Sequence, residues 1–152
     1  MKIQEAEIQD LESILKLQKD CYVEEATLYN DFEIPPLTQT LESIKEDYKK
    51  ETFLKIEFEN KIIGSVRGNL DGNTCKIGRL IVDNNFRNQG LGKRLMFEIE
   101  YKFHSAERFE LFTGHKSDRN LALYNKLGYS EFQRKRINEE LELIFLEKRN
   151  SQ

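Results

Sequence analysis

The chain has 152 residues, and its 24 lysine and arginine residues nearly balance 27 aspartate and glutamate residues, for a formal net charge of −3. This length suits one domain with a single buried core. A global basic field for nucleic acid is excluded, and no apolar run approaches the ~18 residues of a membrane span. Because the N-terminus also lacks the apolar core of a signal peptide, we expect a cytoplasmic protein with no nucleic-acid or membrane partner.

Cysteines and histidines are few. Cys21 and Cys75 are too far apart in sequence for a disulfide framework or a zinc site, and His104 and His115 are the only histidines. We therefore expect two reduced thiols and no metal.

The N-terminal part of the chain predicts one strand and two helices. The strand covers Lys2 to Ala6. Asp10 can cap a helix, whose apolar stripe is Leu11, Ile14, Leu15, Leu17 and Cys21. An irregular segment from about Tyr22 to Leu37 is expected next, because Pro35-Pro36 cannot continue a helix and push Ile34 into an extended form. The second helix carries Leu41, Ile44 and Tyr48.

From Thr52 the apolar period changes to two, which predicts antiparallel strands. The apolar positions are Phe53, Leu54, Ile56 and Phe58, then Ile62, Ile63 and Val66. Glu59-Asn60 is the expected first turn, and Asp71-Gly72 is the expected centre of a type I′ hairpin leading into a strand that ends at Val82.

The C-terminal part predicts a helix, a strand, a helix and a hairpin. Leu91, Leu95, Ile99 and Phe103 form one helical stripe. The next strand covers Arg108 to Thr113, and the next helix is capped by Ser117 or Asp118 and ended by Gly128. The hairpin joins Phe132–Ile137 to Leu141–Glu147, and Arg149 to Gln152 is expected to fray.

The resulting order, β-α-α-β-β-β-α-β-α-β-β, predicts a mixed α/β (α+β) fold. We expect one domain over residues 1–152. We expect a mixed central sheet of about seven strands flanked by about four helices.

The stretch from Arg87 to Lys93 places Gly90 and Gly92 where a strand gives way to a helix. Unpaired amides and the positive end of the helix dipole point forward there, so a diphosphate can approach closely. A Rossmann fingerprint needs a third glycine, and a P-loop needs serine or threonine after Lys93, where Arg94 stands. A tight turn with no ligand is the alternative.

Two motifs in order resemble the GNAT superfamily of N-acetyltransferases. Arg-x-x-Gly-x-Gly after Val82 resembles its acetyl-coenzyme A motif. A second segment resembles its Asn-x-x-x-Tyr helix closed by Leu-Gly-Tyr: Ser117, Asn120, Leu123-Tyr124 and Leu127-Gly128-Tyr129. The resemblance covers nearly the whole chain and implies a GNAT fold, in which two central strands splay apart to admit the pantetheine arm.

The resemblance also implies a cofactor site. The backbone of Leu80, Ile81 and Val82 would pair with pantetheine amides and polarise the thioester carbonyl. Arg87, Gly90 and Gly92 match the positions that contact the pyrophosphate, with Asn88, Gln89, Leu91 and Lys93 around them. The alternative for Leu80, Ile81 and Val82 is a plain core strand. The alternative for Arg87 and Lys93 is that they are solvated surface cations.

Tyr124 matches the family's tyrosine that protonates the departing thiolate, and Asn120, one helical turn earlier, would bind the pantetheine arm. A tyrosine remains protonated until the thiolate forms. The alternative is a tyrosine that only fills core beside Leu121 and Leu127.

The general base is not identified. The strand where many family members carry a glutamate offers Lys76 and Arg79, so Glu110 on the next strand is a candidate only if it faces the cleft. By resemblance, the irregular segment binds the acceptor. Its acidic residues would favour a cationic amine, although exposed carboxylates commonly serve solubility: Glu24, Glu25, Asp31 and Glu33, with Tyr22 and Tyr29 among them.

The expected function is therefore acetyl transfer from acetyl-coenzyme A to a primary amine, in a ternary complex without a cysteine nucleophile. A non-catalytic acyl-coenzyme A binding module is the alternative. The sequence leaves three points open: whether the acceptor is a small molecule or a peptide, which acyl chain length is preferred, and whether the protein is a homodimer.

Overall fold

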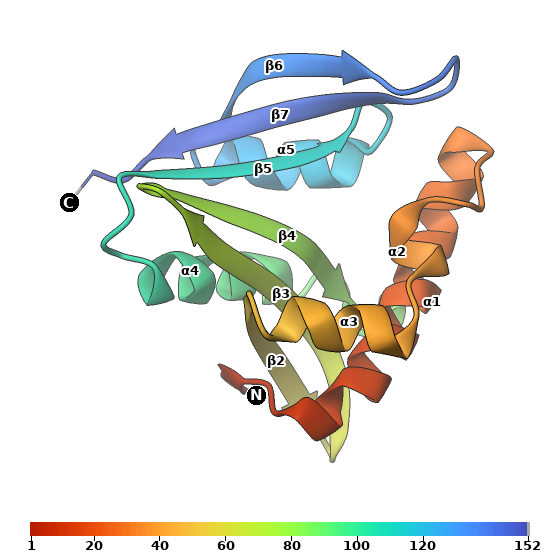
Figure 1. The fold of residues 1–152 in the computed structure, drawn as a ribbon, viewed down its shortest axis with the longest axis vertical. Helices are drawn as coiled ribbons and strands as arrows, with labels where there is room; N and C mark the ends of the chain where they lie inside the picture. The colour runs from red at the N-terminus through yellow and green to blue at the C-terminus, as the bar shows by residue number, and fades with distance from the viewer. Residues whose placement is uncertain (152) are drawn as a thin grey trace.

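The computed structural model describes residues 1–151 as one seven-stranded sheet with helices on both faces (Figure 1). The strands are β1 Lys2–Glu5, β2 Thr52–Phe58, β3 Lys61–Asp71, β4 Thr74–Val82, β5 Arg108–Gly114, β6 Ser130–Arg136 and β7 Glu142–Arg149. The helices are α1 Leu11–Tyr29, α2 Pro35–Thr38, α3 Leu41–Tyr48, α4 Leu91–Lys102 and α5 Asp118–Lys126, with 3₁₀ turns at Ile8–Asp10 and Asn84–Phe86.

The strand order is β1-β2-β3-β4-β5-β7-β6, and every neighbouring pair is antiparallel except β4 and β5. This parallel pair arises because α4 carries the chain back to the same end of the sheet before β5 begins. The mixed seven-stranded sheet predicted from the sequence is confirmed.

Two buried clusters show how the helices cover the sheet. On one face, α1 and α3 pack on β2 through a cluster that includes Leu11, Ile44 and Phe53. On the other face, α4 and α5 share a larger cluster. Strand alternation separates the clusters, because Phe53 belongs to the first and its neighbour Leu54 to the second.

The segment after Tyr22 is helical, which corrects the expectation of an irregular region. Helix α1 continues to Tyr29 because Ala26 and Tyr29 are buried, and Asn30 ends it in a left-handed conformation with φ of 48°. The prolines begin α2 instead of blocking a helix, since the first turn needs no N–H donor from them. Ile34 is extended as expected.

Two further expectations change at turns and ends. Glu59 and Asn60 form a turn with positive φ as predicted, whereas in the next hairpin Asp71 still pairs with Thr74, and only Gly72 has positive φ. The expected fraying is wrong for Arg149, which pairs with Arg108 in the sheet.

Asn150 is also ordered, because its side-chain amide donates to the carbonyl oxygens of His104 and Ala106. Gln152 lies outside the described residues.

The two parallel strands separate along their length. β4 pairs with β5 only from Thr74 with Arg108 to Lys76 with Glu110, although β4 continues to Val82. Figure 1 shows the two arrows diverging from that point. The splay expected from the family resemblance is therefore present, and it leaves one edge of the end of β4 without a neighbouring strand.

Candidate functional site

A cavity of about 470 Å³ lies at the open end of the splayed strands, bounded by α1, the end of β4, the loop before α4 and the start of α5. Ten of the twelve cofactor-binding residues predicted from the sequence line it: Leu80, Ile81, Val82, Arg87, Asn88, Gly90, Leu91, Gly92, Lys93 and Asn120. Gln89 and Tyr124 are not among the lining residues. The chain thus brings most of the predicted site together.

The loop before α4 presents a row of unused amides. From Arg87 to Lys93, no backbone N–H donates to any group of residues 1–151, and the first bonded amide is that of Arg94, at 3.1 Å from the carbonyl oxygen of Gly90. Asn88 and Gly90 both have positive φ, at 63° and 77°. When residues with positive φ alternate with residues of negative φ, successive backbone N–H groups point into the same concave space, and this geometry suits an anion.

The loop's cations differ in their contacts. Arg87 Nη1 lies 2.7 Å from Glu24 Oε2 on α1, and the hydrogen bond from Arg87 lowers the pKa of Glu24. Lys93 is exposed and forms no ion pair within the described chain. A phosphate at this loop would therefore find Lys93 uncommitted and would share Arg87 with Glu24.

The end of β4 has one paired edge and one open edge. Ile81 and Val82 pair with Ser65 and Gly64 of β3, so their opposite edge faces the gap. One carbonyl is partly used, because Cys21 Sγ lies 3.4 Å from the oxygen of Val82. The open edge is the one that the resemblance assigns to pantetheine.

Tyr124 stands beside the gap on α5. Its ring is buried and packs near Tyr129, and its hydroxyl bonds to no described residue. Burial raises the pKa of Tyr124, and the nearby Tyr22 and Glu25 of α1 raise it further. Because α1 covers the opposite face of the sheet, these three side chains approach one another through the opening between β4 and β5.

A hydrogen-bonded chain that the sequence did not predict fixes Glu25. The amide of Lys116 donates to the Tyr29 hydroxyl at 2.9 Å, which donates to Ser117 Oγ at 2.8 Å. Ser117 donates in turn to Glu25 Oε2 at 2.6 Å. Glu25 Oε1 has no such partner in the part of the chain that the structure describes, so one carboxylate oxygen remains available to the cavity.

Gly114 makes this contact possible. A Cβ atom built there would lie 2.0 Å from the Tyr29 hydroxyl, so no other residue allows the approach. The sequence pointed to Ser117 as a helix cap. Ser117 does occupy the cap position, but its hydroxyl accepts no bond from the helix. Ser117 could thus be singled out from the sequence, but its contacts with Glu25 and Tyr29 on α1 could not.

Three candidates for acid–base or acceptor roles lie elsewhere. Glu110 accepts a 2.8 Å bond from Arg108 at the closed end of the splay, which removes it as a base facing the cleft. Of the acidic residues after Tyr22, Asp31 and Glu33 do not line the cavity, whereas Glu24 and Glu25 do. Among residues 1–151, no group of three or more His, Cys, Asp or Glu side chains could hold a metal.

Comparisons with known proteins agree with this geometry. A model of the acetyltransferase (GNAT) family matches residues 11–129. A comparison with curated proteins found no significant match. No helix within residues 1–151 is long and apolar enough to cross a membrane.

Several solved structures share the fold. The ribosomal-protein-S18-alanine N-acetyltransferase of Escherichia coli has a TM-score of 0.82 at 14% identity over 99% of this chain and 94% of its own. The ribosomal-protein-alanine N-acetyltransferase of Brucella melitensis has a TM-score of 0.77 at 18% identity over 98% and 99%. The PaiA N-acetyltransferase of Thermoplasma acidophilum, solved with coenzyme A, has a TM-score of 0.70 at 17% identity over 97% and 98%.

These structural likenesses lie at identities that establish the fold alone. The family model, in contrast, spans most of the 152 residues. The chain therefore belongs to the acetyltransferase (GNAT) family, whose enzymes take their acetyl group from acetyl-coenzyme A.

Proposed function

We propose that this protein transfers the acetyl group of acetyl-coenzyme A directly to a primary amine in a ternary complex, with Tyr124 as the general acid. The observation that carries the proposal is the row of unbonded amides from Arg87 to Lys93 at the edge of the cavity. Such amides, at the start of a helix and beside Lys93, suit a diphosphate.

Acetyl-coenzyme A supplies the acetyl group as a thioester, and transfer has two requirements. The acceptor ammonium must lose one proton to solvent before the neutral amine attacks the carbonyl carbon and a second proton as the amide forms, and the thiolate released when the C–S bond breaks must gain a proton. Tyr124 fits the second requirement. Because burial raises its pKa, the hydroxyl keeps its proton at neutral pH until negative charge develops on an adjacent sulfur. Its lack of a hydrogen-bond partner in the described chain leaves that proton available.

Glu25 is the carboxylate best placed for the amine. It lines the cavity, its position is fixed by Ser117, and it affects the ionisation of Tyr124 across the gap. Glu24, in contrast, is paired with Arg87. We assign to Glu25 the binding of the acceptor ammonium, which is the role proposed for the acidic residues of this segment.

A covalent relay through cysteine is disfavoured. Burial raises the pKa of Cys21 to about 11 and that of Cys75 to about 12, so neither thiol ionises near neutral pH. Mass spectrometry of the enzyme after incubation with acetyl-coenzyme A should accordingly find no acetylated cysteine.

The proposal is tested by following thiol release from acetyl-coenzyme A with a panel of amines, peptides and amino acids. Amine-dependent release is the expected result. Tight binding of acetyl-coenzyme A without release for any amine would instead support the second candidate, an acyl-coenzyme A binding module. The uncommitted Tyr124 hydroxyl favours the enzyme. Cytoplasmic location stays a prediction, and the oligomeric state stays open.

A further inference from the structure

Three buried side-chain atoms within residues 1–151 have no hydrogen-bond partner: Ser65 Oγ, Arg67 Nε and Arg79 Nε. All three belong to one short stretch of the β3–β4 pair, where Ser65 lies opposite Ile81 and Arg67 opposite Gly78. Buried polar groups in folded proteins are nearly always paired. Their concentration at one point of the sheet indicates that a polar ligand belongs beside it.

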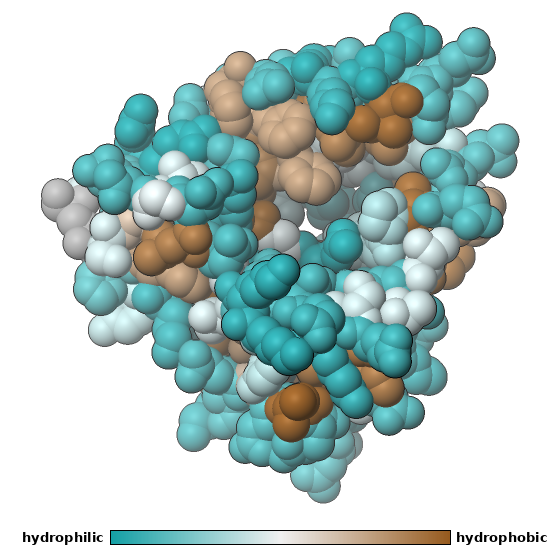
Figure 2. Space-filling model, viewed as in Figure 1, coloured by the Kyte–Doolittle hydropathy of each residue, from teal (hydrophilic) through white to brown (hydrophobic). Residues whose placement is uncertain are grey.

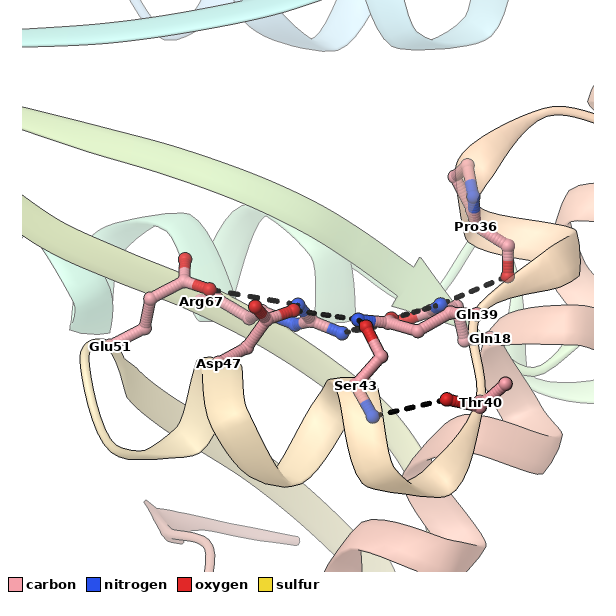
Figure 3. A network of polar contacts seen from close by, with 8 residues as sticks. All are labelled: Gln18, Pro36, Gln39, Thr40, Ser43, Asp47, Glu51 and Arg67. Carbon is pink, nitrogen blue, oxygen red and sulfur yellow. Dashed lines mark hydrogen bonds and ion pairs between the residues drawn. The ribbon is translucent and has the colours of Figure 1, made fainter.

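Arg67 is held rigidly by the helices above it (Figure 3). Its Nη1 lies 2.8 Å from Asp47 Oδ2 and 3.6 Å from Glu51 Oε2. Its Nη2 donates to Gln18 Oε1 at 2.7 Å and to Gln39 Oε1 at 3.1 Å. With only 3% of its surface exposed, Arg67 is a fixed structural cation already neutralised by protein carboxylates.

Arg79 differs in every one of these respects. It is only partly buried, and it makes no hydrogen bond or ion pair within the described chain. Its φ is 51°, in the left-handed region that non-glycine residues seldom adopt, and it occupies the position where the pairing of β3 with β4 shifts. The strand thus bulges in a way that presents a guanidinium without an ion pair in the described chain, although Glu51 and Arg67 lie near enough for the charge of Arg79 to shift their pKa values.

The bulge lies next to the cavity. Arg79 follows the last β4–β5 pair, at Lys76, and directly precedes Leu80, which lines the cavity. It also lies near Tyr22, whose pKa is raised by burial while the charge of Arg79 opposes that rise. Tyr22 itself lines the cavity.

The molecule is also open on this side. Figure 2 shows a hollow between the block formed by β5, β6 and β7 and the block that contains α1 and α2, on the face viewed in Figure 1. A ligand can therefore approach from the side of α1 without crossing the amide row before α4.

We propose that the acetyl acceptor carries a carboxylate close to its amine, and that Arg79 binds this carboxylate while Glu25 binds the ammonium. The inference rests on the proposed function and names its substrate class: a small amino acid rather than a polyamine. Tyr22 and Glu25 are three residues apart on α1 and so share one face of the helix. Arg79 is not itself among the residues that line the cavity, but it lies next to Leu80 and near Tyr22, which do. A cation and an anion therefore lie close to the same opening, a pattern that complements a zwitterion.

The diphosphate of acetyl-coenzyme A is not the expected partner of Arg79. Its binding elements are the amides and cations from Arg87 onward, beyond the end of β4. Arg79 precedes Leu80–Val82 on β4, and so lies on the opposite side of this segment from that loop. Removing its charge should therefore affect the acceptor and leave acetyl-coenzyme A binding unchanged.

The test compares amino acids with their carboxamides, and with diamines, as acceptors in the thiol-release assay. We expect amino acids to exceed the matched amides in kcat/KM by about tenfold or more, the effect of one charge-assisted hydrogen bond. Arg79→Asn, chosen because asparagine tolerates positive φ, should raise the KM for amino acids by a similar factor and abolish the difference from the amides. Aminophosphonates in the panel distinguish a carboxylate from a phosphate-type anion.

Lys76→Asn is the matched control, because it removes an exposed cation from the same strand. It should leave all kinetic constants unchanged, and thermal unfolding of both variants verifies their fold. Four results would overturn the proposal. The wild-type enzyme could use amino acids and their amides equally, prefer diamines, or prefer aminophosphonates alone. Alternatively, Arg79→Asn could reduce activity by the same factor for amino acids and for their amides.

A second measurement separates this inference from the proposed function. Calorimetry of N-acetyl amino acids with the enzyme–coenzyme A complex should show binding that Arg79→Asn weakens about tenfold or more, even if no turnover occurs. Absence of binding, or equal binding to the variant, would reject the Arg79 site. If coenzyme A itself does not bind, the proposed function is rejected, and the inference about Arg79 is rejected with it.

Discussion

Ser117 donates a 2.6 Å hydrogen bond to Glu25, and this contact joins the start of α5 on one face of the sheet to α1 on the other. It is possible only because β4 and β5 have separated at that level. The same opening thus brings Tyr124 of α5 and Glu25 of α1 close enough for the charge of Glu25 to raise the pKa of Tyr124.

Replacement of Gly90 by valine should abolish acetyl-coenzyme A binding. Gly90 has φ of 77°, and a branched residue there would strain the loop, at a cost of about 1–2 kcal/mol, and turn its amides away from the anion. Isothermal calorimetry gives the affinity. Gly72→Val is the matched control, since Gly72 has φ of 62° in a distant hairpin with open space around it. Both variants should lose similar stability, but only Gly90→Val should lose affinity; equal affinities would refute the assigned role of the loop.

Tyr124→Phe should lower kcat by about 10²-fold and leave the KM for acetyl-coenzyme A nearly unchanged. The substitution removes only the proton donor, and the hydroxyl forms no bond in the described chain whose loss would disturb the fold. Steady-state kinetics over the accessible pH range measures the effect. Tyr101→Phe, at a residue that is 69% exposed, controls for loss of a phenol. Normal turnover by the Tyr124 variant at every pH would remove it from the acid role.

Ser117→Ala should weaken acceptor use by releasing Glu25. We expect the KM for the amine to rise by about threefold to tenfold, corresponding to about 1 kcal/mol for one hydrogen bond. Glu25→Gln should have a larger effect, and the double variant should resemble Glu25→Gln alone, because Ser117 acts through Glu25. Additive losses in this cycle would mean that the two residues act independently.

Acid should destabilise the protein partly through Asp10. Burial alone would raise the pKa of Asp10, but the hydrogen bond and charge of Lys55, 2.7 Å away, leave it below its ordinary value of 3.8. A carboxyl whose pKa is lowered on folding stabilises the protein above that ordinary value, and the stability is lost as pH falls through the folded pKa.

Urea unfolding at a series of pH values between neutrality and acid measures this contribution. Asp10→Asn should cost about 1–3 kcal/mol at neutral pH and flatten the acid limb of the stability curve. Glu12→Gln, an exposed neighbour in the same helix turn, is the control. An unchanged acid limb in Asp10→Asn would contradict the role of the Asp10–Lys55 pair.

Much of the fold could be read from local pattern. The apolar period of Leu91, Leu95 and Ile99 and the turn at Glu59-Asn60 each depend on a few neighbouring residues, and both agree with the structure. The end of α1 could not be read in this way. Helix continuation past Tyr22 depends on the burial of Ala26 and Tyr29, and Tyr29 is buried against Ser117, 88 positions away in the chain.

The sequence by itself determined the order of elements apart from the short helix α2, the glycine-containing turn at Gly90 and the family, because backbone conformation and motif spacing are local properties. Tertiary structure alone decided which polar groups meet: Glu25 with Ser117, 92 positions apart, and Arg67 with Asp47. It also left Arg79 without a partner at the bulge. Such pairings follow from sheet register and helix placement, which depend on the packing of the whole chain and not on any short stretch of it.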